Sequence, residues 1–76
     1  MKTNEKDLVV LNNIAVALFN IGSFREAIIF FKKLSIHENN SINSLRSLGI
    51  TYKNIGEYEK AIEYFVKTNI SEHSTF

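Results

Sequence analysis

The 76-residue sequence predicts an all-α fold, in which two helix-turn-helix repeats stack four antiparallel helices as in an α-solenoid. The first observation is an internal repeat, because Asn-Ile-Gly occurs at 20–22 and again at 54–56, an offset of 34. Aligned at that offset, residues 8–41 and 42–75 are identical at ten of 34 positions, where composition alone gives about two or three. Apolar residues also recur at spacings of three and four on both sides of each glycine, as in helices with one buried side. Alternating strand patterns and hairpin turn dipeptides are missing from the sequence, which disfavours a sheet.

The repeat sets the expected organisation of the chain. We expect a polar leader over 1–7, a first repeat over 8–41, a second over 42–73 and a short tail over 74–76. The apolar spacing predicts helices over 6–21, 24–37, 41–55 and 58–71. Gly22 and Gly56 are expected to end the first helix of each repeat, because glycine adopts the left-handed backbone conformation without steric cost.

Two helix starts carry capping residues. Ser23, followed three residues later by Glu26, predicts a capping box at the second helix. Asn40 or Ser41 is expected to cap the third helix through its side-chain oxygen.

The repeats also share an ordered pattern of small and large residues. The second repeat carries Leu45-x-x-Leu48-Gly49-x-x-Tyr52 and then Ala61-x-x-x-Phe65, and the first carries Leu11, Ile14, Ala15, Leu18, Ala27 and Phe31 in the same order. In this order, in its period and in its turn position, the chain resembles the tetratricopeptide repeat family. Asn39 replaces the family's proline between repeats, and Thr68 replaces a preferred alanine. The resemblance implies a non-enzymatic module that binds a protein or peptide.

Composition excludes several classes of function. The net charge of +1 gives no basis for binding nucleic acid, and the absence of cysteine is compatible with a cytoplasmic location. Residues 8–24 carry no charge, but they include polar side chains and are too few to span a membrane. Catalytic motifs, phosphate-binding loops and metal-ligand spacings were not found in the sequence, so we expect neither an enzyme nor a cofactor or metal.

A partner-binding groove is expected along the first helix of each repeat, because these helices line the concave side of such solenoids. At 100° per residue, several side chains fall opposite or beside the buried stripe, and asparagine can both donate to and accept from a peptide backbone. The groove residues predicted in this way are Asn13, Val16, Asn20, Arg46, Ser47, Ile50, Lys53 and Asn54.

Self-association is also expected, because the sequence has more apolar residues than one copy of two repeats can bury. The residues assigned to it are Val9, Phe19, Ile29, Ile62, Phe65 and Val66. Further repeats of a longer array would cover the same residues, and the sequence leaves that alternative open.

Three hypotheses follow from these observations. The first is an interaction module that binds a protein or peptide in its groove and forms a homo-oligomer. The second is a purely structural homo-oligomerisation unit whose groove is filled by another copy. The third is a fragment of a peptide-sensing bacterial regulator.

Overall fold

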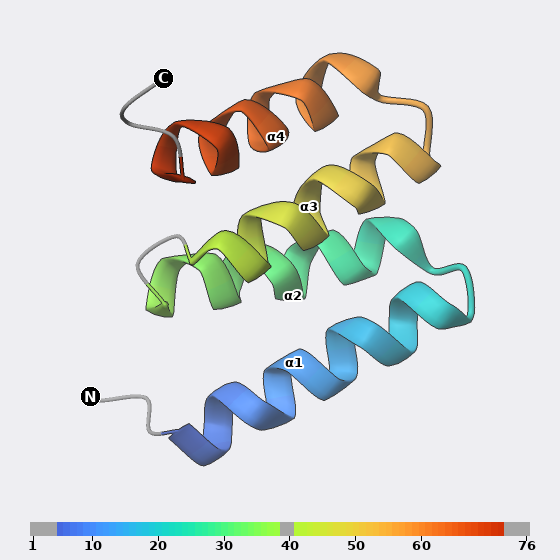
Figure 1. The fold of residues 1–76 in the computed structure, drawn as a ribbon. Helices are drawn as coiled ribbons and strands as arrows, with labels where there is room; N and C mark the ends of the chain where they lie inside the picture. The colour runs from blue at the N-terminus through green and yellow to red at the C-terminus, as the bar shows by residue number, and fades with distance from the viewer. Residues whose placement is uncertain (1–4, 39–40, 73–76) are drawn as a thin grey trace.

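Four α-helices follow one another along the chain and pack in sequence. The computed structural model describes residues 5–38 and 41–72, with α1 at Glu5–Asn20, α2 at Phe24–His37, α3 at Ile42–Asn54 and α4 at Tyr58–Glu72. Figure 1 shows successive helices running antiparallel, with α3 crossing in front of α2, and the packed pairs are α1 with α2, α2 with α3 and α3 with α4. This arrangement confirms the predicted all-α fold of two helix-turn-helix repeats.

The turns inside the two repeats are built alike. Gly22 and Gly56 have φ angles of 88° and 84°, in the left-handed region that favours glycine. At the first turn the Ser23 N–H donates to the Leu18 carbonyl at 2.8 Å, and the Gly22 N–H donates to the Phe19 carbonyl at 3.0 Å. The same two bonds close the second turn, both at 3.0 Å. This bond pair defines the Schellman motif, so each first helix ends with its last carbonyls satisfied.

The predicted capping box at Ser23 is wrong. Ser23 lies at the N-cap position of α2, but its side chain makes no capping hydrogen bond. Its backbone N–H, which Glu26 would have to accept from in a capping box, is already bonded to Leu18 in the preceding turn. The cap of α3 is confirmed at Ser41, whose hydroxyl accepts from the Ser44 N–H at 3.2 Å.

The core lies along the contacts between successive helices. Its buried members are Ala15, Ala27, Ile28, Phe31, Leu34, Leu48, Tyr52 and Ala61. Small residues recur among them because two helices approach closely only where a side chain is short. Ile14 is 38% exposed, although its counterpart Leu48 in the second repeat is buried, while Leu11 and Ala15 face the core.

Candidate functional site

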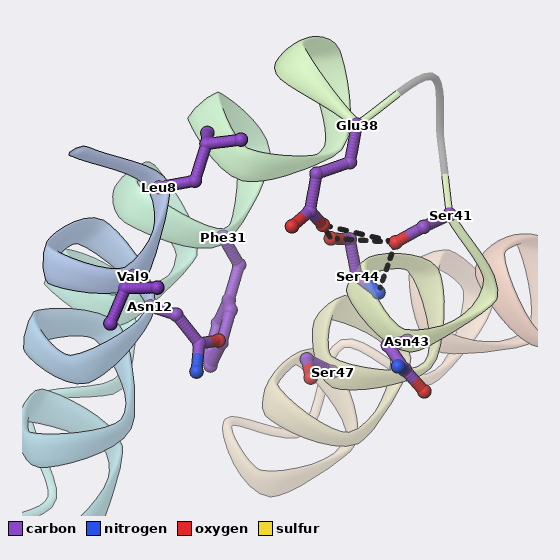
Figure 2. Close-up of a pocket in the computed structure, with 9 residues that line it drawn as sticks. All are labelled: Leu8, Val9, Asn12, Phe31, Glu38, Ser41, Asn43, Ser44 and Ser47. Atoms are coloured by element: carbon purple, nitrogen blue, oxygen red, sulfur yellow. Dashed lines mark hydrogen bonds between the residues drawn. The ribbon is translucent and has the colours of Figure 1, made fainter. Parts of the chain in front are cut away.

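A hollow of about 640 Å³ opens between the first halves of α1 and α3. Figure 2 shows Asn12 of α1 and Ser47 of α3 on opposite sides of the Phe31 ring, which comes from α2. The complete lining is Leu8, Val9, Asn12, Phe31, Glu38, Ser41, Asn43, Ser44 and Ser47. Amides and hydroxyls therefore face an apolar floor across the gap between the repeats.

Glu38 is the charged residue in this lining, and the start of α3 holds it in place. The Ser44 hydroxyl donates to its Oε1 at 2.6 Å, and the Ser41 hydroxyl lies 3.1 Å from the same oxygen. Hydrogen bonds to an ionised carboxylate are among the stronger ones in proteins. The fixed carboxylate gives this end of the hollow a negative charge (Figure 2).

A second hollow of about 230 Å³ continues the first toward the other end of the helices. Val16 and Phe19 of α1 and Ile50 of α3 line it, together with Phe31 and Ser47. Because Phe31 and Ser47 line both hollows, the two lie next to each other between α1 and α3. We refer to the two hollows together as the groove, which is polar at the Glu38 end and apolar at the other.

The groove contains some of the residues predicted from the sequence. Val16, Ser47 and Ile50 line it. The remaining predicted residues are exposed and line neither hollow: Asn13, Asn20, Arg46, Lys53 and Asn54.

The rotation of α1 about its own axis explains why Asn13 lies outside the groove. The buried stripe of α1 includes Leu11 and Ala15, and the groove stripe contains Asn12 and Val16, each one residue later. One residue is a rotation of about 100°, so the groove lies beside the buried stripe rather than behind it. The sequence reasoning placed the groove opposite the buried stripe and so favoured Asn13 over Asn12.

Sequence reasoning also missed the polar end of the groove. Glu38 precedes the N-cap residue Ser41 by three positions, and Ser44 follows it by three. This spacing around a helix start was the available signal, because it brings a side chain before the cap within reach of the first turn. Phe31 belongs to the ordered pattern of the first repeat, and its buried ring also forms the groove floor.

The residues assigned to self-association fall into two groups. Val9, Ile29, Ile62 and Val66 are exposed apolar side chains. Phe19 and Phe65 are instead half-buried against the core of their own chain. Phe19 lies edge-on to Phe24 with ring centroids 5.1 Å apart, so its ring has a partner within the same turn region.

A column of stacked side chains connects α2, α3 and α4. Tyr52 and Tyr64 stack with centroids 5.7 Å apart, and the Lys32 Nζ lies 5.9 Å from the centre of the Tyr52 ring. A hydrogen bond with Tyr52 raises the pKa of Lys32, because it favours the charged ammonium. Burial raises the pKa of Tyr64, because it disfavours the phenolate.

Two other kinds of site are absent from the residues that the structure describes. No helix within 5–38 and 41–72 is long and apolar enough to cross a membrane. Over the same residues, no three or more His, Cys, Asp or Glu side chains are grouped so that they could hold a metal ion.

Comparison with known proteins gives the family. No match to the chain was found among curated proteins or among solved structures. A family model for the tetratricopeptide repeat matches residues 8–34 and 43–67, which is more than half of the chain. Repeats of this kind generally mediate contacts between proteins and are typically not enzymes. With two matched helix-turn-helix units, each turning at a left-handed glycine, the chain belongs to the tetratricopeptide repeat family.

Proposed function

We propose that this chain is a non-enzymatic interaction module that binds an extended protein segment in the groove and also self-associates. The observation that carries the groove proposal is that its two hollows share Phe31 and Ser47. Two adjoining hollows of this kind suit several consecutive residues of a peptide rather than one small ligand. The absence of cysteine suits a cytoplasmic setting.

The lining indicates which segments would fit. Val16, Phe19 and Ile50 would contact an apolar side chain at one end. Asn12 and Asn43 present amides that can pair with a peptide backbone whatever its sequence. Glu38 would favour a basic group at the other end, because opposite charges steer association and set orientation.

Catalysis is not part of the proposal, because the groove lining holds one ionisable side chain. Glu38 is engaged by two serines at the start of α3. The described lining offers it no histidine, lysine or second carboxylate to complete an acid–base pair. Nucleic acid is an unsuitable partner for the same groove, since its charged residue is an anion.

Selection of binding peptides tests the groove. A phage-displayed library of random peptides is screened against the chain, and recovered peptides are titrated by fluorescence polarisation. Asn12→Ala should weaken binding about fivefold, the effect of losing one hydrogen bond of about 1 kcal/mol. Asn13→Ala is the matched control, because Asn13 is the neighbouring exposed asparagine on α1 and lines neither hollow.

Two outcomes would contradict the groove proposal. One is equal weakening by the two alanine variants, which would place the peptide elsewhere on α1. The other is a screen that recovers no specific peptide while the protein associates with itself. That result favours the purely structural unit over a module with an outside ligand.

Self-association is supported by exposed apolar side chains on the outermost helices. Val9, Val10 and Val16 on α1 and Ile62 and Val66 on α4 are all exposed in one copy. Contiguous apolar surface on a small protein generally marks an interface. Light scattering over a concentration series tests it, and a constant monomer mass would refute it.

A further inference from the structure

We propose that copies of this chain stack head to tail, with α4 of one copy packed against α1 of the next. In this contact, α4 and the α1 of the next copy would take the same relative position that α2 and α3 have within the chain. This inference rests on the self-association proposed above, and it names the partner and the geometry. The α4 face is defined here by Ile62 and Val66, and the α1 face by Val10 and Ile14.

The α4 face is the counterpart of a surface that is covered within the chain. α2 packs on α1 and also on α3, whereas the main packing partner of α4 among the described helices is α3. Ile28 of α2 is 7% exposed, and Ile62, the same residue type 34 positions later on α4, is 59% exposed. The identical residue is thus buried where a following helix covers it and open where none does.

The α1 face gives the reciprocal comparison. α3 packs on α2 as well as α4, whereas the main packing partner of α1 among the described helices is α2. Ser44 and Leu48 of α3 are 4% and 0% exposed, and their counterparts Val10 and Ile14 on α1 are 53% and 38% exposed. α1 therefore carries more apolar residues at these positions than the helix that is actually covered.

The proposed contact also pairs compatible side chains at the place where Lys32 and Tyr52 meet within the chain. Within the chain, Lys32 of α2 lies over Tyr52 of α3. The equivalent pair between copies is Val66 with Leu18, two apolar side chains. Burying this pair removes apolar surface from water without desolvating a charge.

Two acidic residues on α4 lie where the covered interface leaves its residues in water. Glu59 and Glu63 are equivalent to Arg25 and Ile29. Arg25 and Ile29 both stay exposed although α3 packs against α2. Residues 8–24 of the opposing copy carry no charge, so that stretch brings no ion into the contact.

Stacking would extend the groove across the junction. In the internal groove, Asn12 and Phe19 of α1 face Ser47 of α3. At the junction between two copies, Arg46 and Lys53 of one copy take the places of Asn12 and Phe19. Asn13 of the next copy takes the place of Ser47 and faces them. Three residues that line neither hollow of the groove in a single copy would thereby form a second, basic groove that needs the partner copy.

Two variants with opposite defects test the arrangement. Val10→Asp places a charge in the α1 face, and Ile62→Asp places one in the α4 face. A head-to-tail contact joins two different faces, so each variant should remain monomeric alone. Their equimolar mixture should form a dimer that grows no further, because each supplies the face that the other has lost. The unmodified chain should grow beyond twice its mass of 8.7 kDa as its concentration rises.

The matched control is Ile36→Asp. Ile36 is an exposed isoleucine like Ile62, but it lies on α2, which takes no part in the proposed contact, so this substitution should leave the mass unchanged. A mixture that stays monomeric while the unmodified chain associates would overturn the head-to-tail geometry but not self-association. A monomeric unmodified chain at every concentration would overturn both.

Cross-linking provides a test that does not depend on how the aspartate variants fold. Within the chain Arg25 and Glu57 form an ion pair at 3.0 Å at the edge of the α2–α3 contact, and their counterparts between copies are Glu59 and Ser23. The chain has no cysteine, so Ser23→Cys with Glu59→Cys gives two defined sites for a short bis-maleimide. A ladder of covalent multimers is expected on a denaturing gel. If the double-cysteine variant gave no larger covalent multimers than either single-cysteine variant, the proposal would be overturned.

Discussion

Gly49 of α3 lies directly under the ring of Phe65 of α4. A Cβ placed on Gly49 would lie 2.7 Å from the Phe65 Cε1, closer than side-chain carbons normally approach. The equivalent positions of the first repeat hold Ala15 and Phe31, both of them buried. The first helix of each repeat therefore carries a small residue at this position, alanine in the first repeat and glycine in the second.

Substitutions at Gly49 should separate helix propensity from packing. Gly49→Ala should change the free energy of unfolding by less than about 1 kcal/mol, because alanine's gain in helix propensity offsets displacement of the half-buried Phe65 ring. Gly49→Val should destabilise by about 1–3 kcal/mol, because a branched side chain cannot be accommodated by the ring alone. Urea unfolding followed by circular dichroism at fixed protein concentration measures both. A valine variant as stable as the parent would show that α3 and α4 are not in this contact.

Alanine at either turn glycine should be costly for a different reason. Gly22 and Gly56 have open space where a Cβ would lie, but their φ angles are strongly positive. Gly22→Ala and Gly56→Ala should each lower the free energy of unfolding by about 1–2 kcal/mol through backbone strain. Thermal or urea unfolding tests this. Asparagine variants should lose less, since asparagine tolerates this conformation better than alanine.

The two serines that precede helices should respond differently to alanine. Ser41→Ala removes the hydroxyl that caps α3 and contacts Glu38, and should cost about 1 kcal/mol of stability. Ser23→Ala should be nearly neutral, because the Ser23 side chain makes no capping bond. Equilibrium unfolding of the two variants side by side is the measurement, and equal losses would contradict the assignment.

Stability should decline in alkali. The raised pKa values of Lys32 and Tyr64 mean that the folded chain holds these protons more tightly than the unfolded chain. The stability that these two groups contribute is fully present below the pKa values of about 10 that they have in the unfolded chain. It is lost as the pH rises through their higher pKa values in the folded chain. Urea midpoints between about pH 9 and pH 11 should therefore fall.

A pair of tyrosine variants identifies the source of that decline. Tyr64→Phe should flatten the pH dependence, because it removes one of the two titrating groups. Tyr58→Phe is the control, since Tyr58 is an exposed tyrosine at the start of the same helix. An equal slope in both variants would mean that other groups govern the alkaline loss.

The sequence predicted the fold well because its signals are local and repeated. Three signals can be recognised without knowledge of the tertiary structure: the 34-residue offset, the two glycines and the apolar spacing. The capping box at Ser23 failed because its backbone N–H was already used by the previous turn, which a local pattern does not show. Asn12 was missed because the groove wall depends on how α1 and α3 are placed around α2, and that placement is tertiary.

The order of packing, with each described helix in contact with its chain neighbours, also sets how the molecule should fold. Contacts that join residues close in sequence form quickly, because little chain must be brought together before they stabilise. The backbone amides of α2 and α3 should exchange hydrogen most slowly, because each of these helices has two packed neighbours. α1 and α4 should unfold locally before them. Folding would then nucleate at the junction between the repeats and spread to both ends, as in a one-dimensional array whose units are single helices.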